Sequence, residues 1–320
     1  MNAIRLHEFG PAENLRYEPV DDPVPGPGQV RISVAAAGVH LIDTAIRSGV
    51  RMGPLPLPDL PAIPGREVAG VVDALGPGVE PGWHGRRVVA HLGAASAGYA
   101  ELAVREVEHL HALPGGLPDT VAVAMIGTGR TAMAILDTAR IGADDVVLVT
   151  AAAGGLGALL TQAARAAGAT VAGVAGPAKL DRVAADVAVD YTRPDWPDAV
   201  REALGGREVT VALDGVGGEA GRATLELLAR GGRHVIYGWS SGEMTRISTG
   251  DIVSRSLTVS SALVRPGSMR ALEERALAAA ADGRLVPLLT RFPLAEAAAA
   301  HAALEGRATV GKVVLLAGPA

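Results

Sequence analysis

A hydrophobic run that leads directly into a glycine-rich turn, and then into an amphipathic segment, is the feature that most constrains this chain. The run Asp145–Thr150 is continuously apolar at its centre, as expected for a strand that is covered on both faces. It continues into Ala151–Gly157 and then into Leu156–Ala167, where leucine and alanine recur at helical spacing. A strand, a tight turn and a helix in this order predict the first unit of a doubly wound α/β domain.

The turn has small residues at the three positions that the G-x-G-x-x-G pattern requires, which here are Ala152, Gly154 and Gly157. Small side chains let backbone N–H groups approach a pyrophosphate, and the start of the following helix adds a partial positive charge. The predicted dinucleotide site consists of Ala152, Ala153, Gly154, Gly155, Leu156 and Gly157. The alternative is a plain strand-to-helix turn, because a chain with 41 glycines in 320 residues produces such patterns by chance.

The residues after the second strand of this unit indicate which dinucleotide is bound. A site for NAD typically places Asp or Glu at the end of that strand, where it holds the ribose 2′-hydroxyl. Here the strand Thr170–Ala175 is followed by Gly-Pro-Ala-Lys, and Lys179 can pair with a 2′-phosphate. Tyr191, after the third strand, is a candidate for the same phosphate or for the adenine edge. We therefore expect NADPH; the alternatives are a solvated surface lysine and a tyrosine that only packs.

The pattern of the chain changes near residue 119. Before it, short apolar runs separated by glycine and proline predict a barrel-like β domain, with strands at 29–34, 67–75, 87–90 and 99–104. After it, a helix is expected over 120–138, and strands then alternate with helices. The later strands are expected at 187–190, 209–214, 233–238 and 257–262, with a helix at 217–228. The C-terminal region is expected to form helices at 268–284 and 294–304 and a strand at 309–317.

Charge and cysteine content exclude several classes of function. The net charge of −5 argues against nucleic acid or an anionic membrane as the main partner, because both require a basic surface. The absence of cysteine removes disulfides, thiolate zinc sites and cysteine nucleophiles. No apolar run approaches the roughly 20 residues that span a bilayer, and the first ten residues lack the apolar core of a signal peptide. We expect a soluble cytoplasmic protein.

Several segments together resemble the zinc-independent quinone oxidoreductases of the medium-chain dehydrogenase/reductase superfamily, the zeta-crystallin-like branch. The segments that carry the resemblance are Ala37–Asp43, Ile46–Gly49, Pro64–Val72, Ala151–Gly157, Asp214–Gly218 and Gly306–Val314. The resemblance implies a GroES-like β domain of residues 1–118 and 263–320, with a Rossmann domain of residues 119–262 inserted. It also implies hydride transfer from NADPH to a quinone or an activated alkene, and a homodimer.

The chain departs from its relatives at three positions that matter for chemistry. Zinc-dependent relatives have a cysteine where His40 stands and a histidine where Arg66 stands, so this chain cannot rebuild their zinc site, and we expect no metal. The quinone reductases usually have asparagine at the position of His40 and often tyrosine at that of Ala45.

Reduction of a quinone or an enone requires a hydrogen-bond donor at the carbonyl oxygen and later a proton. His40 is the first candidate, with a loop-fixing role as the alternative. Arg66 can polarise the carbonyl, or pair with Glu67 or Asp43 and hold the fold. Thr131 matches the family's Gly-x-Thr-Ala segment near the nicotinamide, with a structural hydroxyl as its alternative.

Four further residues enter the interpretation. Gly215 and Gly238 are expected to border the cofactor through their backbone, or else only to form turns. His109 and His111 are two residues apart, so a strand would make both face the same way. We expect them to form part of a polar strand face; the alternative is a pair that chelates a metal ion.

Three functions compete at this point. The first is an NADPH-dependent quinone or enone reductase. The second is an enoyl reductase for a biosynthetic intermediate, free or carrier-bound. The third is a non-catalytic protein that binds NADPH, an interpretation motivated by the unusual His40 and Ala45. Sequence does not separate these substrates, because fold does not fix function.

Overall fold

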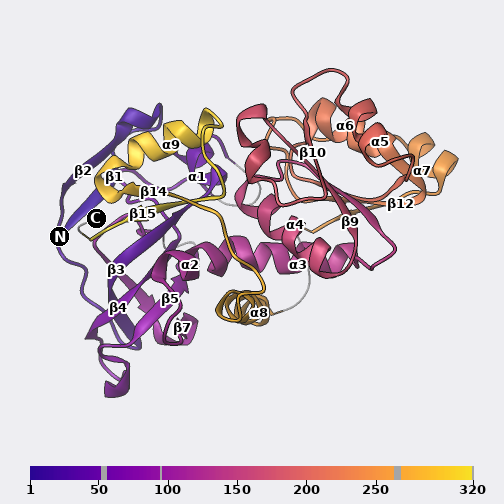
Figure 1. Cartoon of the computed structure of the whole chain (residues 1–320). Helices are drawn as coiled ribbons and strands as arrows, with labels where there is room; N and C mark the ends of the chain where they lie inside the picture. Colours follow the sequence, from indigo (N-terminus) through magenta and orange to yellow (C-terminus); the bar gives the residue numbers. More distant parts are fainter. Residues whose placement is uncertain (52–55, 94–95, 263–267, 319–320) are drawn as a thin grey trace. The chain divides into compact units, whose positions relative to one another are not determined.

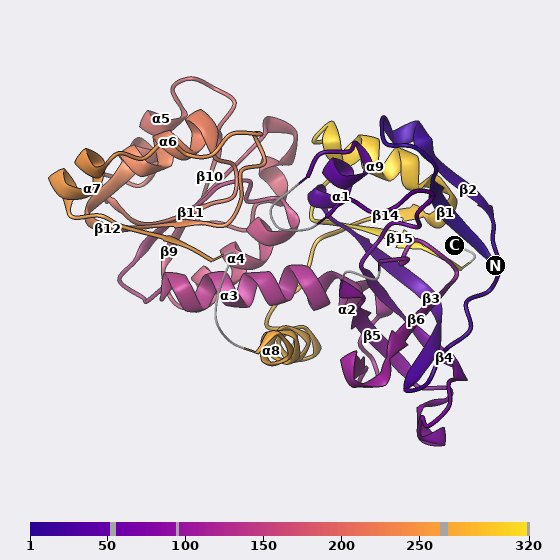
Figure 2. The same ribbon diagram turned by 180° about the vertical axis from the view of Figure 1, so that it is seen from behind.

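The protein is seen here in a computed structural model. The structure describes residues 1–51, 56–93, 96–262 and 268–318. The chain divides into two compact units, which Figures 1 and 2 show from opposite sides. The first unit comprises Met1–Gly127, Leu277–Asp282 and Leu289–Ala320, and the second comprises Thr128–Ala276 and Gly283–Leu288.

The first unit is built on a seven-stranded sheet to which both ends of the chain contribute. Its strand order is β14-β15-β3-β4-β5-β7, and β6 pairs with β3 outside this path. The strands are β3 (Gln29–Val39), β4 (Glu67–Leu75), β5 (Arg87–His91), β6 (Leu102–Glu106), β7 (Leu110–Ala112), β14 (Leu289–Pro293) and β15 (Lys312–Leu316). The C-terminal β15 lies antiparallel to β3, with Leu315 opposite Ala37. Two further strands, β1 (Asn2–Leu6) and β2 (Leu15–Pro19), form a separate antiparallel pair.

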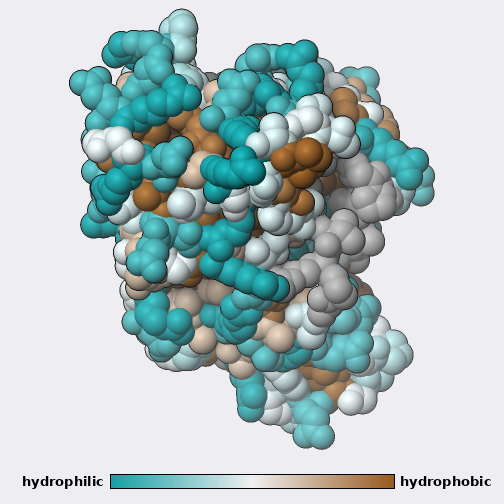
Figure 3. All heavy atoms as spheres, turned by 90° about the vertical axis from the view of Figure 1, so that its right-hand side faces the viewer, coloured by the Kyte–Doolittle hydropathy of each residue, from teal (hydrophilic) through white to brown (hydrophobic). Residues whose placement is uncertain are grey.

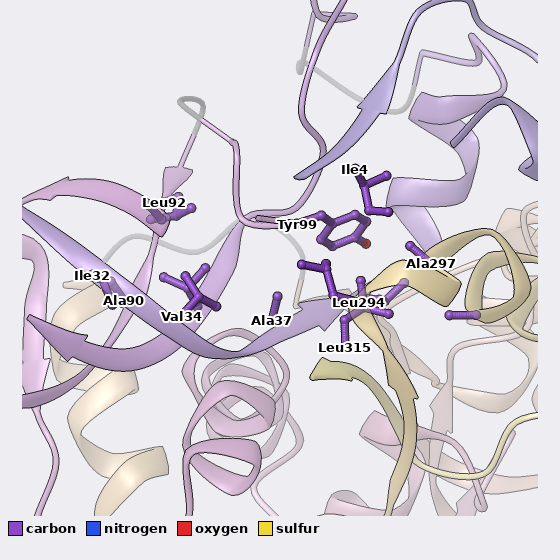
Figure 4. Close-up of a cluster of buried hydrophobic side chains, with 14 of the residues drawn as sticks. Ile4, Ile32, Val34, Ala37, Ala90, Leu92, Tyr99, Leu294, Ala297 and Leu315 are labelled. Atoms are coloured by element: carbon purple, nitrogen blue, oxygen red, sulfur yellow. The ribbon is translucent and has the colours of Figure 1, made fainter. Parts of the chain in front are cut away.

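One hydrophobic core fills this unit, because side chains alternate between the two faces of each strand. In β3 the residues Val30, Ile32 and Val34 are buried in turn. Figure 4 shows the ring of Tyr99 lying among aliphatic side chains that come from both ends of the chain, including Ile4 and Leu294. Burial of this apolar surface stabilises the unit and fixes the strands that carry its polar residues.

Two short helices of the first unit matter for its polar side chains. Helix α1 (Leu41–Arg47) starts directly after β3, and the backbone N–H of His40 donates to Oδ2 of Asp43 at 2.8 Å. An acidic residue in the first turn is favourable, because it accepts from an N–H group that has no helical partner. The start of α1 therefore holds His40 at the end of β3. Helix α9 (Ala297–Glu305) is joined to α1 by an ion pair between Arg47 and Glu305.

The second unit contains a six-stranded parallel sheet with the order β10-β9-β8-β11-β12-β13. Its strands are β8 (Val146–Val149), β9 (Thr170–Ala175), β10 (Val187–Asp190), β11 (Val209–Asp214), β12 (Leu228–Ile236) and β13 (Thr258–Ser261). Numbered along the chain, the order is 3-2-1-4-5-6, the order of a doubly wound dinucleotide-binding fold. The predicted α/β fold class is confirmed, and the order reverses between β8 and β11.

Helices follow the strands of this sheet. They are α3 (Arg130–Ala139), α4 (Gly155–Ala166), α5 (Trp196–Ala203), α6 (Gly218–Leu227) and α7 (Thr249–Arg255). Helix α4 buries Leu159, Leu160 and Ala164 on one face, as its spacing predicts. It ends before Gly168, whose φ of +85° is the left-handed conformation that commonly terminates helices.

The limits of the two units differ from the predicted domain limits at two helices. Helix α2 (Asp119–Ala124) contacts β3, β4 and β5, so it belongs to the first unit. Helix α8 (Met269–Ala281) begins in the second unit, where Arg275 pairs with Asp137, and ends in the first.

Three local predictions are wrong. The helix expected over 120–138 is interrupted by a π-helical turn at Met125–Gly129, whose two glycines disfavour a continuous helix. The strand expected at 99–104 begins only at Leu102, because the backbone N–H of Tyr99 donates to the carbonyl oxygen of Pro64. His109 lies in a turn with a half-exposed side chain whereas His111 is buried in β7, so the two do not share a strand face.

Hydrophilic side chains predominate on the face shown in Figure 3, with hydrophobic ones in small patches between them. None of the helices in the described part of the chain combines the length and hydrophobicity that a bilayer crossing needs.

Candidate functional site: a nucleotide-binding turn and a buried polar cluster

In the turn between β8 and α4, the backbone at Gly157 lies unusually close to the backbone of Ala151 and Ala152. Ala151 has a φ of +48°, which turns the chain out of the strand, and the N–H of Gly154 donates to the carbonyl oxygen of Ala151 at 2.8 Å. A Cβ atom on Gly157 would lie 2.2 Å from that same oxygen and 2.8 Å from Cα of Ala152. Only glycine fits at position 157, which is the role of the last glycine in a dinucleotide-binding turn.

The same turn presents unused hydrogen-bond donors at the start of a helix. The first internal bond of α4 runs from the N–H of Ala158 to the carbonyl oxygen of Gly154, at 2.9 Å. The N–H groups of Gly155, Leu156 and Gly157 precede this bond and point toward the N-terminal end of α4. Together with the helix dipole, N–H groups in this arrangement are suited to accept an anion next to the carboxyl end of β8.

The two residues predicted to select the dinucleotide lie near the carboxyl end of β9, Lys179 in the turn after β9 and Tyr191 directly after β10. Lys179 is half-buried in a short turn at Pro177–Arg182 that follows the strand. The backbone N–H of Tyr191 donates to the carbonyl oxygen of Ala175 at 3.2 Å, and its ring packs partly against the core of the second unit. Both residues therefore lie beside the carboxyl end of β9. Tyr191 lies at this position and also packs against the hydrophobic core.

The loop after β11 is held by a buried carboxylate. Oδ1 of Asp214 accepts from the backbone N–H groups of Val216 and Gly217 at 3.0 Å, and Oδ2 accepts from Oγ1 of Thr245 at 2.6 Å. Burial raises the pKa of Asp214, but hydrogen bonds from His234 and Thr245 outweigh it, and the net pKa is lowered. Asp214 is thus a charged anchor for this loop.

Gly215 and Gly238 meet at the carboxyl ends of β11 and β12. The N–H of Gly215 donates to Oγ1 of Thr150 at 2.9 Å, and a Cβ at Gly215 would lie 2.4 Å from the ring of Tyr237. A Cβ at Gly238 would lie 3.0 Å from the carbonyl oxygen of Gly215. Gly215 leaves no room for a side chain between the two loops, and at Gly238 a side chain would fit only after a shift of a few tenths of an ångström. Thr131 lies in the first turn of α3 and is half-buried.

A second group of polar residues lies in the first unit, around a fully buried carboxylate. Oε1 of Glu67 lies 2.6 Å from Nε2 of His40, and Oε2 lies 2.9 Å from Nζ of Lys312. Nζ of Lys312 also lies 2.7 Å from Nε2 of His40. We call these three residues the His40 cluster. Burial raises the pKa of Glu67, but its interactions with His40 and Lys312 outweigh this effect and hold the pKa far below its usual value.

Two glycines let the backbone close over this carboxylate. A Cβ on Gly38 would lie 2.2 Å from Oε2 of Glu67, and a Cβ on Gly127 would lie 1.6 Å from Oε1. The π-helical turn at Met125–Gly129 therefore places backbone, not a side chain, against Glu67. The geometry of the cluster depends on glycine at both positions.

Arg66 pairs with an acidic residue, as one of its two predicted roles requires. Its guanidinium donates to Oδ1 of Asp43 at 3.2 Å, and Oδ2 of Asp43 accepts from the hydroxyl of Tyr99 at 3.2 Å. The Tyr99 oxygen in turn lies 3.2 Å from Nε2 of His301. Burial, with the neighbouring charge of Asp43, raises the pKa of Tyr99 far above its usual value.

The buried His301 predicts a pH dependence of stability. Burial lowers its pKa to about 4, while an exposed histidine in the unfolded chain titrates near 6.5. Between these values the unfolded chain binds more protons, so stability is lost as the pH falls through the window. The loss amounts to about 3 kcal/mol for a shift of this size. The measurement is hydrogen exchange of the most protected amides of the first unit at pH 4 and pH 7. Between these pH values His301→Phe is expected to lose less stability than the wild type by that amount; equal losses would contradict this.

Sequence reasoning missed most of the supporting residues. Lys312 and Tyr99 were not proposed as partners of the site, and neither was His301. One signal was present: Lys312 is one of only two lysines and stands beside an apolar run, where a charge is unexpected unless it is paired.

The chain is similar in sequence and structure to several known proteins. The family model described as "Alcohol dehydrogenase GroES-like domain" matches residues 26–135, and that described as "Zinc-binding dehydrogenase" matches residues 183–315. A 2-haloacrylate reductase from a Burkholderia species is 32% identical over 331 residues, with 98% of each chain covered.

Two solved structures are similar over nearly the whole chain. The quinone oxidoreductase of Escherichia coli, crystallised with NADPH, is 30% identical with a TM-score of 0.85, covering 99% of this chain and all of that one. A structure described as an NAD-dependent alcohol dehydrogenase is 33% identical with a TM-score of 0.88 over the same shares.

Proposed function

Because the chain belongs to the quinone oxidoreductase branch of the medium-chain dehydrogenase/reductase superfamily, we propose that it transfers hydride from NADPH to a quinone or an α,β-unsaturated carbonyl compound without zinc. The observation that carries the proposal is the turn between β8 and α4, where only glycine fits at position 157 and three N–H groups precede the helical bonds. Backbone donors arranged in this way fit the pyrophosphate of a dinucleotide.

The residues of the second unit have distinct parts in holding the cofactor. Residues 152–157 would bind the pyrophosphate through their backbone, Lys179 and Tyr191 would meet the adenosine end, and Gly215 and Gly238 would line the nicotinamide end with Thr131. NADPH supplies the hydride when it is bound. The protein supplies position and charge.

Cofactor preference tests the part assigned to Lys179. Replacing this lysine with methionine removes the cation that would face the 2′-phosphate and keeps a chain of similar length. We expect the Kd for NADPH to rise roughly 10- to 100-fold, the size of one charge-assisted hydrogen bond. The Kd for NADH serves as the internal control and should change little, because NADH carries no 2′-phosphate. Equal changes for both cofactors would remove Lys179 from the phosphate site.

The first unit would supply the proton. Hydride addition leaves negative charge on the carbonyl oxygen, which a positioned donor must stabilise and then protonate. His40 is our candidate, because its side chain is about one quarter exposed while its two partners in the cluster are buried. Arg66 would act electrostatically at most, since its guanidinium already pairs with Asp43.

The donor set of the chain supports a reaction without zinc. There is no cysteine, and Arg66 stands where the zinc-dependent relatives have a histidine. A guanidinium donates hydrogen bonds and does not ligate a cation. In the described part of the structure, no three His, Asp or Glu side chains are grouped to hold a metal ion.

Turnover over a panel of acceptors tests the proposal. Purified protein without added metal is mixed with NADPH and with quinones, simple enones, enoyl thioesters or 2-haloacrylates, the last because of the similar reductase. Oxidation of NADPH by a quinone or an enone supports the proposal. A steep preference for one enoyl thioester would select the enoyl reductase, and binding of NADPH without any turnover would select the non-catalytic protein.

The homodimer implied by the family belongs to the same proposal. Sedimentation equilibrium is expected to give twice the mass of one 320-residue chain. A stable monomer would contradict the proposed dimer and would leave the proposed hydride transfer unaffected.

A further inference from the structure

One ring nitrogen of His40 lies between a proton donor and a proton acceptor. Nε2 is 2.7 Å from Nζ of Lys312 and 2.6 Å from Oε1 of Glu67. The contact with Lys312 has the geometry of a hydrogen bond, whereas the contacts of the Glu67 carboxylate are ion pairs. Nε2 can therefore accept from Lys312 when it is unprotonated, and face Glu67 when it carries a proton, with no atom moving far.

The three side chains differ in their access to solvent. The side chain of Glu67 is fully buried and that of Lys312 is 4% exposed, whereas that of His40 is 25% exposed. The backbones of Gly38 and Gly127 lie against Glu67 and leave no room for a side chain there. Of the three, His40 is the member through which the buried pair can reach a substrate.

The charges around this pair keep a proton available. Burial lowers the pKa of Lys312, and the attraction of Glu67 only partly opposes this; Asp43 and Arg66 face the same ammonium with opposite effects. Glu67 also faces His91 in addition to His40 and Lys312. A carboxylate held in its charged form, beside an amine that burial makes more acidic, favours proton movement between Lys312 and His40.

We propose that Lys312 and Glu67 are positioning residues that resupply His40 with a proton, Lys312 by giving it to Nε2 and Glu67 by facing the N–H group that results. The inference rests on the proposed function, in which His40 is the acid. It adds a specific role for a lysine that is distant from His40 in the sequence.

Each proton transfer in the His40 cluster breaks one bond to hydrogen and forms another. His40 begins as a neutral ring with its proton on Nδ1, and Lys312 begins as an ammonium. The Nδ1–H bond breaks and the proton passes to the anionic oxygen of the reduced substrate, while an Nζ–H bond breaks and its proton passes to Nε2. His40 is then neutral again, Lys312 is an amine, and the cluster has lost one proton, which it regains from water.

The test compares two substitutions of Lys312 in the full-length protein. Lys312→Arg keeps a positive charge beside Glu67, but its guanidinium does not give up a proton. We expect kcat to fall at least about tenfold, the lower range for loss of acid–base assistance, and to acquire a solvent deuterium isotope effect. The Kd for NADPH should not change. Wild-type kcat and pH profile in Lys312→Arg would overturn the proposal.

A second readout does not need turnover. In ¹⁵N-histidine spectra at neutral pH, Nε2 of His40 is expected to be unprotonated in the wild type and protonated in Lys312→Met, where only Glu67 remains beside it. The same Nε2 state in both proteins would overturn the coupling. Arg31→Met is the control, because it breaks the ion pair with Asp73 in the same sheet and should leave both readouts unchanged.

The two experiments separate failure of this inference from failure of the proposed function. If the wild type reduces no quinone or enone, the proposed function fails, and the nitrogen spectra still decide whether Lys312 controls the proton on His40. If the wild type is active and Lys312→Arg matches it, only the positioning role fails.

Discussion

Replacing Gly154 with aspartate is expected to raise the Kd for NADPH at least about 100-fold while the protein stays folded. Gly154 has φ −80° and ψ 174°, an extended conformation that any residue can adopt. An added Cβ would lie 3.1 Å from the carbonyl oxygen of Ala151, which requires only a small shift. The new carboxylate would stand at the start of α4, where the pyrophosphate is proposed to bind. Two like charges about 4 Å apart repel by roughly 4 kcal/mol at the effective dielectric of a protein surface.

Two matched variants isolate the effect of charge. Gly154→Asn has nearly the shape of the aspartate without its charge, and Gly154→Ala adds only the methyl group. Isothermal titration should rank the wild type and Gly154→Ala as the tightest, Gly154→Asn as intermediate and Gly154→Asp as the weakest. Equal affinities for the asparagine and aspartate variants would show that no anion lies at this helix start.

Replacing Glu67 with glutamine is expected to destabilise the first unit by about 3–5 kcal/mol, the usual cost of leaving one partner of a buried ion pair alone. The side chain of Lys312 is only 4% exposed, and its ammonium would lose the carboxylate that lies 2.9 Å away in the wild type. Because a chain of two units need not unfold in one step, hydrogen exchange of the amides in β4 and β15 is the suitable measurement. The double variant Glu67→Gln/Lys312→Met removes both charges and should recover most of the loss.

The pH dependence of the same variant has a definite sign. The pKa of Glu67 is lowered in the folded state, so its contribution is fully present above the unfolded value of about 4.3 and is lost as the pH falls below it. Glu67→Gln therefore differs most from the wild type at neutral pH. A variant that is as stable as the wild type at pH 7 would show that the charge of Glu67 makes no net contribution to the free energy of unfolding.

The α/β unit was predictable because its signals are local. The apolar runs at Thr170–Ala175, Val187–Asp190 and Val209–Asp214 form strands with those bounds, since strands covered by helices are continuously hydrophobic. Elements without such runs were missed. Strand β2 alternates weakly and exposes most of its residues, and α5 is a short helix that begins with a tryptophan and a proline.

The turn between β8 and α4 was predictable in its geometry for the same reason, because one strand, one turn and one helix contain it. The His40 cluster was only half predictable. His40 was singled out by its place in the family pattern. Its contact with Lys312, however, depends on the antiparallel pairing of β15 with β3, which brings the start of β15 to the end of β3. Such a contact is set by tertiary structure, and in sequence a buried charge looks like an exposed one.

Titration of the wild-type protein with NADPH in a calorimeter tests the central claim most directly. Saturable binding with one site per chain, tighter than for NADH, is the predicted result. A flat titration with both reduced cofactors at concentrations well above the protein's would contradict the assignment of the turn between β8 and α4, and with it the proposed reaction.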